Sequence, residues 1–203
     1  AALSEHDVLQ SVNSKLGTGE VTEAVLATDQ RVLARVSDGI YRKPGSAIRE
    51  LIANAYDADA TEVVVRTDAP RFGTISVHDN GVGMNQETLV RLIHHIGGSA
   101  KRTRDAPGLG VSSPNDPNYS PMGRRLIGKI GIGLFAVAQL TRHFRIITKR
   151  KGMDVRLVAD VSLRTYSEDE VSESDTDNIV TGRVELSSVP AEDTDSAGTE
   201  VIL

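Results

Sequence analysis

The sequence predicts an α+β protein in which helices cover one face of a mixed, largely antiparallel sheet. Two observations lead to this fold class. Helical patterns and β-branched segments come in blocks, without the regular alternation that builds a parallel sheet. The first two β-branched segments, 61–67 and 73–79, are joined by a short loop with proline and glycine, which favours an antiparallel hairpin. The 203 residues are enough for one domain with a sizeable core.

The composition excludes several kinds of protein. There is no cysteine, which rules out disulfides, thiolate zinc sites and a thiol nucleophile. The net charge of -5 provides no overall basic field for nucleic acid. The longest nearly apolar run, 130–140, is too short to span a bilayer, and the N-terminus lacks the pattern of a signal peptide. We therefore expect a cytoplasmic protein without a membrane partner.

The first helices are placed by their capping residues. Residues 1–28 have little pattern and are expected to form an N-terminal extension. Thr28 or Asp29 can cap a short helix that follows. Pro44 fits the first turn of the next helix, where its missing N–H costs nothing, and that helix is expected to end near Asp59.

The middle of the chain is predicted to be a helix followed by a long loop. Asn85 is an N-cap for a helix over 86–96. Residues 97–127 hold many glycines and prolines. So long a stretch without periodic pattern is either functional, as a lid over a ligand, or evidence that an element has been assigned wrongly. The later elements are a helix over 134–140, strands at about 142–149, 153–161, 182–189 and 198–203, and a solvated acidic loop over 168–177.

The helix over 44–59 carries the first candidate site. Its apolar stripe, at helical spacing, is expected to consist of Ile48, Leu51, Ile52 and Ala55. Glu50, Asn54 and Asp57 stand at i, i+4 and i+7, so they project from one other face. An acid, an amide and a second acid in a row could hold a water and a hydrated metal. The same face could equally be a solvated helix surface.

The second candidate site is the turn over 79–84, at the end of a predicted strand. Gly81 and Gly83 let the backbone approach a ligand closely or adopt positive φ. Asp79, just before them, can accept a hydrogen bond from a donor such as an exocyclic amine. The alternative is an ordinary turn, because Asp-Asn-Gly is also favourable turn chemistry.

The third candidate site is the glycine-rich stretch 128–133, directly before a predicted helix. Free N–H groups and the positive end of the helix dipole at such a place bind phosphates. Lys129 would add a point charge. The spacing fits neither the Walker loop nor the dinucleotide-binding fingerprint, because the strands and following residues that those motifs require are missing.

Taken in order, these motifs resemble the GHKL ATPases, the superfamily of DNA gyrase, the 90-kDa heat-shock chaperones, sensor histidine kinases and MutL, with the MORC proteins as relatives. The motifs are E-x-x-x-N-x-x-D on a helix, D-x-G-x-G-M in a turn, a glycine- and proline-rich lid, and G-x-x-G-x-G before a helix. The segment 198–203 (GTEVIL) is similar to the G-T-x-V-x-L strand of the family. The resemblance covers about residues 30–203 and implies a Bergerat-type two-layer sandwich with a long ATP lid.

The resemblance implies a role for each polar residue of the helix. Glu50 would be the general base that polarises the water attacking the γ-phosphate. Asn54 would bind Mg²⁺, an ion that accepts few protein ligands and keeps several waters. Asp57 would lie beside the adenine or support the helix.

The resemblance also divides the other motifs between the base and the phosphates of ATP or ADP. Asp79 would accept from the adenine amino group, directly and through a water shared with Thr199. The residues that make room for the purine or pack on it would be Gly81, Gly83 and Met84. The residues that hold the phosphates would be Ser99 and Lys101 in the lid, and Gly128, Lys129, Ile130, Gly131, Ile132 and Gly133 in the glycine-rich stretch.

Within the superfamily, the motifs are most similar to the chaperone and MORC-like branches. The helix continues as N-A-Y-D, not as the N-A-x-K of sensor kinases, and the glycine-rich stretch lacks the G-F-R-G-E-A-L of MutL. We expect an ATPase domain over residues 29–203 of a longer protein, slow without its downstream transducer domain. ATP would close the lid and pair two N-terminal domains. The client could be a protein or DNA, and the sequence does not identify which. The alternatives are a nucleotide-sensing module without turnover and a MutL-like DNA-repair or DNA-processing ATPase.

Overall fold

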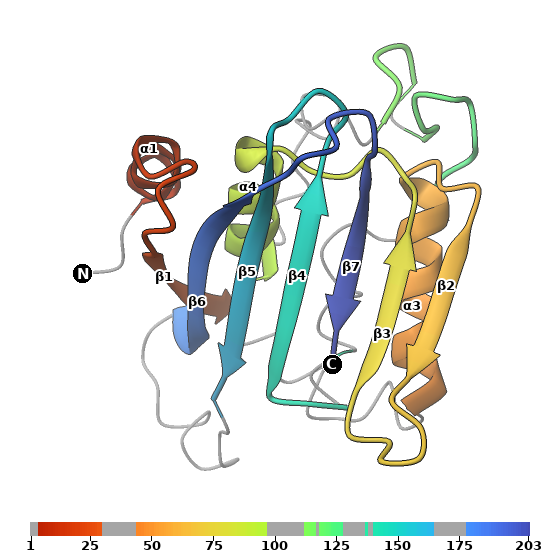
Figure 1. Cartoon of the computed structure of the whole chain (residues 1–203), viewed down its shortest axis with the longest axis horizontal. Helices are drawn as coiled ribbons and strands as arrows, with labels where there is room; N and C mark the ends of the chain where they lie inside the picture. Colours follow the sequence, from red (N-terminus) through yellow and green to blue (C-terminus); the bar gives the residue numbers. More distant parts are fainter. Residues whose placement is uncertain are drawn as a thin grey trace.

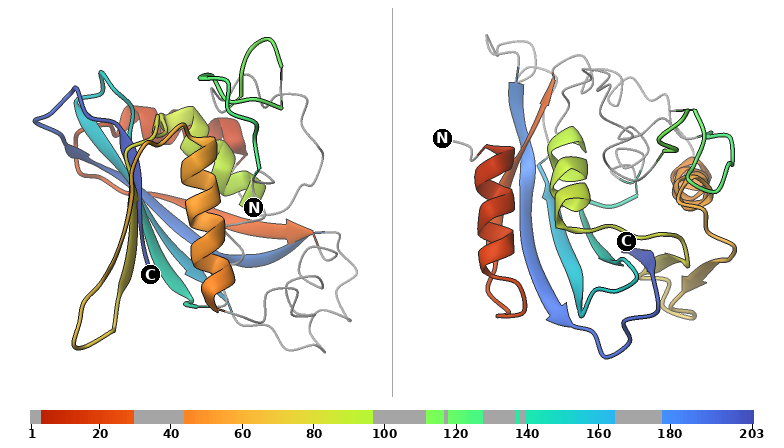
Figure 2. Two further views of the ribbon diagram at one scale, coloured as in Figure 1. Left: turned by 90° about the vertical axis from the view of Figure 1, so that its right-hand side faces the viewer. Right: turned by 90° about the horizontal axis from the view of Figure 1, so that it is seen from above.

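The computed structural model describes residues 4–29, 44–96, 112–116, 118–127, 137, 140–164 and 178–203. Its strands form one seven-stranded sheet in the order β1-β6-β5-β4-β7-β3-β2, with α3 and α4 on one face (Figures 1 and 2). Every pairing among these strands is antiparallel, so the predicted α+β class is confirmed. The elements are α1 (Glu5–Ser14), β1 (Thr22–Asp29), α3 (Pro44–Asp57), β2 (Val63–Thr67), β3 (Ile75–Asp79), α4 (Gln86–Ile96), β4 (His143–Lys149), β5 (Val155–Leu163), β6 (Asn178–Pro190) and β7 (Gly198–Ile202).

The N-terminal residues are more ordered than the sequence indicates. Ser4 and Asp7 form a capping box at the start of α1, and Val8 from this helix is fully buried in the core. β1 is an edge strand paired with β6. The expected boundary after residue 28 therefore falls inside a strand. Thr28 and Asp29 end β1, and the helix that one of them is predicted to cap lies over residues outside the described ranges.

Helix α3 packs against the sheet through small residues. Ala47, Leu51 and Ala55, spaced four apart, are buried, so this row forms the inward face. Ile52 is 41% exposed, and its assignment to the buried stripe is wrong. Alanine is only weakly apolar, so the sequence pattern did not identify Ala47 as part of the helix face that contacts the sheet.

Helix α4 begins where the sequence predicts. The side chain of Asn85 accepts hydrogen bonds from Thr88, at 2.9 Å from its backbone N and 2.7 Å from its hydroxyl. Leu89, Val90 and Ile93 are buried against the core. Arg91 forms an ion pair of 3.1 Å with Glu5 of α1, and α1 packs beside α4 at the β1 edge. No helix in the described ranges is long and apolar enough to cross a membrane.

The sheet has one buried and one more exposed face, as the alternation in its strands requires. In β4, Phe144 and Ile146 are buried while Arg145 between them is exposed. The hairpin predicted over residues 61–79 is confirmed, with Val63 opposite Asp79 and Thr67 opposite Ile75. β7 pairs with β4 on one side and β3 on the other, which brings segments far apart in sequence to the same end of the sheet (Figure 1).

Candidate functional site

Three polar side chains lie in a row across neighbouring strands at one end of the sheet. Asp79 ends β3 and is directly opposite Thr199 in β7, and Thr199 is directly opposite Thr148 in β4. The sequence predicts Asp79 and Thr199 as site residues, and the strand pairing brings them together. Directly opposite positions on one face of a sheet have Cβ atoms close enough for their side chains to interact.

Asp79 is the buried acid of this row, with 8% of its surface exposed. Its Oδ1 accepts a hydrogen bond of 2.8 Å from the backbone N of Gly81. Burial raises the pKa of the carboxyl, while hydrogen bonds from the backbone N–H groups of Gly81 and Thr199 oppose the rise. A buried carboxylate with remaining acceptor capacity suits a ligand that brings its own N–H donors.

Two glycines lie where the strand ends and the turn approach each other so closely that a side chain would not fit. Gly83 has φ +63°, and a side chain there would overlap the carbonyl of Lys149. Gly198 has φ +148°, and a side chain there would overlap the carbonyl of Asp79. The glycine pattern of the turn over 79–84 therefore reflects real close approach of three chain segments.

Thr148 is a site residue that the sequence analysis missed. Its hydroxyl accepts a hydrogen bond from the backbone N of Met84 at 2.9 Å and is 2.9 Å from the hydroxyl of Thr199. It is also 3.1 Å from the carbonyl of Gly198, to which it donates. When its hydrogen points to Gly198, the Thr199 hydroxyl donates to Thr148 and turns its lone pairs outward.

One sequence signal could have found Thr148. It follows Phe144 and Ile146 at the strand period of two, so it belongs to the buried face of β4. A hydroxyl at such a position has to find hydrogen-bond partners, because burying it without them costs free energy.

The polar face of α3 is only partly accessible. Glu50 and Asn54 are half-buried, one helical turn apart, on the helix that packs along β3. Asp57 is buried and its Oδ1 accepts a hydrogen bond of 2.9 Å from the backbone N of Ile127. This contact joins Asp57 to the segment that precedes the glycine-rich stretch.

The remaining predicted phosphate-contacting residues lie outside the described ranges. These residues are Ser99, Lys101, Gly128, Lys129, Ile130, Gly131, Ile132 and Gly133. Met84 is described: it is partly buried and packs against the core beside the turn.

These observations agree with a comparison against known protein families. Residues 41–194 match the family of histidine kinase-, DNA gyrase B- and HSP90-like ATPases, and the chain belongs to this family. The predicted membership of the GHKL superfamily is therefore confirmed.

The curated relatives place the chain nearer to chaperones than the family alone does. It is 28% identical over 160 residues to the mitochondrial heat shock protein 75 kDa of Bos taurus, covering 71% of this chain and 21% of that protein. It is 26% identical over 142 residues to the chaperone protein HtpG of Chlorobium phaeobacteroides, covering 62% and 22% respectively. A shorter match of 55 residues, at 38% identity, links 27% of the chain to 8% of the DNA mismatch repair protein MutL of Staphylococcus epidermidis. The chain thus spans about a fifth of the two chaperones.

The donor set fits a magnesium ion that is bound mainly by other groups. In the described ranges no three His, Asp or Glu side chains are gathered as a metal site. Asn54 offers one amide oxygen on a half-buried face. Mg²⁺ at nucleotide sites keeps several waters and takes the rest of its ligands from phosphates, so one protein oxygen is chemically sufficient.

Proposed function

We propose that this domain binds ATP with Mg²⁺ and hydrolyses it to ADP and phosphate. The single observation that carries the proposal is the row of Asp79, Thr199 and Thr148 at the end of β3, β7 and β4. It supplies a buried acceptor and two hydroxyls. The family membership supports nucleotide binding, and the geometry supports the place where the base is read.

The adenine end of the pocket uses few polar groups. Asp79 accepts from the exocyclic amine of the base, because its carboxylate still has free acceptor capacity after the bond from Gly81. Thr199 adds a hydroxyl beside it that can order a water. A nucleobase with a carbonyl at that position provides no donor to the remaining acceptor capacity of the buried carboxylate, so the site prefers adenine over hypoxanthine.

The phosphate end of the pocket carries the chemistry. Glu50 acts as the general base that orients and polarises the attacking water, and Asn54 is the protein ligand of Mg²⁺. That ion, when bound, neutralises charge on the phosphates. Ser99, Lys101 and the stretch 128–133 hold the β- and γ-phosphates through charge and backbone N–H groups. In-line attack then depends mainly on positioning and on charge neutralisation.

The whole protein is proposed to be an ATP-gated machine. ATP closes the lid and pairs two copies of the domain, and hydrolysis reopens them. The chaperone relatives favour a chaperone-like cycle over a MORC-like or MutL-like one. The ATP-binding unit includes α1 and β1 in addition to residues 29–203, because β1 completes the sheet.

The test separates binding from turnover. Glu50→Ala is expected to bind ATP with Mg²⁺ like the parent in isothermal titration, because Glu50 acts on the attacking water and does not contact the adenine. Phosphate release should fall by roughly 10²- to 10⁴-fold, the usual effect of removing a general base. Release by Glu50→Ala at the parent rate would show that another group is the base. Binding by the parent without any release would favour the sensing module, and no binding would refute the proposal.

A further inference from the structure

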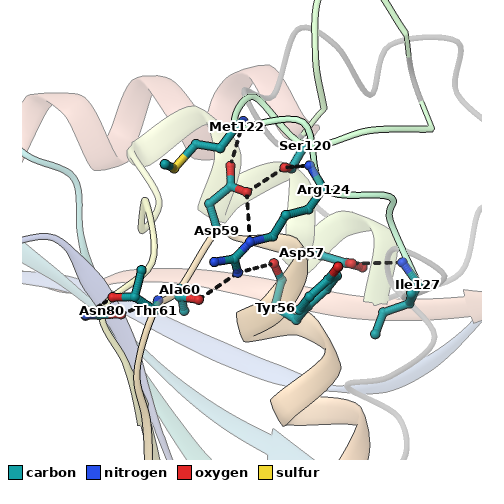
Figure 3. A network of polar contacts seen from close by, with 10 residues as sticks. All are labelled: Tyr56, Asp57, Asp59, Ala60, Thr61, Asn80, Ser120, Met122, Arg124 and Ile127. Atoms are coloured by element: carbon teal, nitrogen blue, oxygen red, sulfur yellow. Dashed lines mark hydrogen bonds and ion pairs between the residues drawn. The ribbon is translucent and has the colours of Figure 1, made fainter.

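The segment 118–127 is fixed to the C-terminal end of α3 by a network of buried polar contacts (Figure 3). The segment is folded on itself: Tyr119 and Arg125 form a β-bridge, and the backbone N of Ser120 donates to the carbonyl of Arg124 at 2.7 Å. Leu126 donates in the same way to Asn118 at 2.8 Å. The segment 118–127 is therefore held together by its own backbone hydrogen bonds where it contacts the helix.

Asp59 is the centre of the network. It has φ +61°, a conformation that non-glycine residues seldom adopt and that aspartate tolerates better than most. Its side chain is almost completely buried. One carboxylate oxygen accepts from the hydroxyl of Ser120 at 2.5 Å, and the other accepts from the backbone N of Met122 at 3.1 Å. This backbone conformation thus directs the carboxylate into the segment 118–127.

Arg124 brings the compensating positive charge. Its Nε is 3.9 Å from Asp59 Oδ1, and its guanidinium also donates to the carbonyl of Ala60 at 2.7 Å. The guanidinium lies over the ring of Tyr56, 5.1 Å from the ring centre. These contacts, with a side chain that is only 28% exposed, fix Arg124 within the protein framework.

A further contact holds the other end of the segment. Asp57 accepts a hydrogen bond of 2.9 Å from the backbone N of Ile127, the residue directly before Gly128. Asp57 and Asp59 therefore hold the segment at two places, near residue 121 and at residue 127. Helix α3, which ends at Asp57, carries Asn54 one turn and Glu50 two turns before that residue.

We propose that Asp59 and Arg124 are positioning residues that set where the glycine-rich stretch starts relative to Glu50 and Asn54. This proposal rests on the proposed function for its effect on nucleotides. Backbone N–H groups recognise phosphates only when they are held in place beforehand, because ordering them on binding costs affinity. The row of Asp79, Thr199 and Thr148 reads the base from a different part of the fold. Loss of the anchor should therefore weaken phosphate recognition and spare recognition of adenosine.

The first experiment measures the anchor without any nucleotide. Asp59→Asn keeps the left-handed backbone accessible, because asparagine also tolerates it, but removes the charge and one acceptor. Hydrogen–deuterium exchange of the amides over 118–127 is expected to rise at least about tenfold, while exchange in β4 and β5 stays unchanged. The matched control is Asp160→Asn, which removes the carboxylate paired with exposed Arg145 on the other face of the sheet. Equal exchange over 118–127 in parent and Asp59→Asn would overturn the proposal.

The second experiment compares two ligands, ATP with Mg²⁺ and adenosine, on the parent, Asp59→Asn and Asp160→Asn. Asp59→Asn is expected to bind ATP at least about tenfold more weakly and adenosine within about twofold of the parent, a difference of roughly 1.4 kcal/mol for ATP alone. Unchanged ATP affinity, or an equal loss for both ligands, would overturn the positioning role.

The two proposals fail in different ways. A parent protein that binds neither ligand refutes the proposed function, and the exchange measurement still decides whether Asp59 anchors the segment. If Asp59→Asn does not fold, Ser120→Ala takes its place, because it removes only the hydroxyl that donates to Asp59. Arg124→Lys keeps the charge but loses the planar pair of donors, so this variant should bind ATP more weakly than the parent but more tightly than Asp59→Asn.

Discussion

Two carboxylates of this domain are buried to nearly the same extent but have different partners. Asp59 is 5% exposed and Asp79 is 8% exposed. Asp59 accepts from a hydroxyl and a backbone N–H and has a guanidinium beside it. Asp79 accepts only from backbone N–H groups, and in the described ranges no lysine or arginine lies within ion-pair distance of it.

The difference separates an acid that serves structure from one that serves binding in the proposed site. A compensated carboxylate such as Asp59 stabilises the contacts around it, and breaking such a pair is costly. An under-compensated one such as Asp79 has a raised pKa and costs folding free energy until a ligand supplies donors. Substitutions at the two positions should therefore have opposite effects on stability.

The largest expected effect is that of Asp79→Asn on ATP binding. The variant places an N–H donor against the adenine amine, so affinity should fall by about 100-fold, as expected when a charged hydrogen bond is lost. Thermal unfolding without ligand at pH 7 should occur at the same or a higher temperature than in the parent, whereas Asp59→Asn should unfold earlier. The comparison of the two acids fails if both variants lose stability alike.

A smaller effect is expected from Thr148→Val, which keeps the shape but removes the hydroxyl. The partly buried N–H of Met84 then loses its acceptor, which costs about 1 kcal/mol of unfolding free energy, measured by denaturant unfolding. ATP affinity should fall about tenfold because Thr199 loses its partner. Thr148→Ser keeps the hydroxyl, so both its stability and its ATP affinity should be close to those of the parent. Parent-like affinity in the valine variant would show that the base is read without this hydroxyl.

The pH dependence of Asp79→Asn sharpens the comparison further. Because burial raises the folded-state pKa of Asp79 above its unfolded value, its contribution to stability is fully present below the unfolded pKa of about 3.9 and is lost as pH rises through the folded value. The stability advantage of Asp79→Asn over the parent should therefore be largest near neutral pH and shrink as the solution is acidified. Unfolding midpoints of both proteins across this range measure it, and a constant difference would contradict the raised pKa.

The smallest effect is expected from the exposed pair of Arg145 and Asp160. Their atoms are 2.6 Å apart, but both side chains are well exposed, and such pairs contribute about 0–1 kcal/mol. Asp160→Asn should therefore change the unfolding temperature little and leave ATP binding intact. A loss as large as that of Asp59→Asn would mean that the charge itself, and not burial, determines these energies.

The sequence predicted those features of the fold that depend on neighbouring residues. The cap at Asn85 and the hairpin over 61–79 are local signals, and both are confirmed. The face of α3 was misjudged at Ile52 because the burial of Ala47 depends on the sheet that it contacts.

The missed features depend on pairing between distant segments. Thr148 meets Thr199 only because β7 lies between β4 and β3, and Arg124 meets Asp59 only after the chain returns to α3. Asp79 and Thr199 could be predicted to lie together only because the resemblance to a family indicates it. The spacing of these two residues in the sequence does not.

The position of β7 in the sheet also has a consequence for how the domain folds. Without β7 the remaining strands would form two separate sheets, β1-β6-β5-β4 and β3-β2. Closing the gap between them requires residues 198–202 to enter between strands that occur much earlier in the sequence, a slow kind of contact because of the chain entropy that it costs. The row of Asp79, Thr199 and Thr148, which is proposed to bind the base, is completed by the same event. Binding of adenosine during refolding would therefore report the moment at which the two halves of the sheet join.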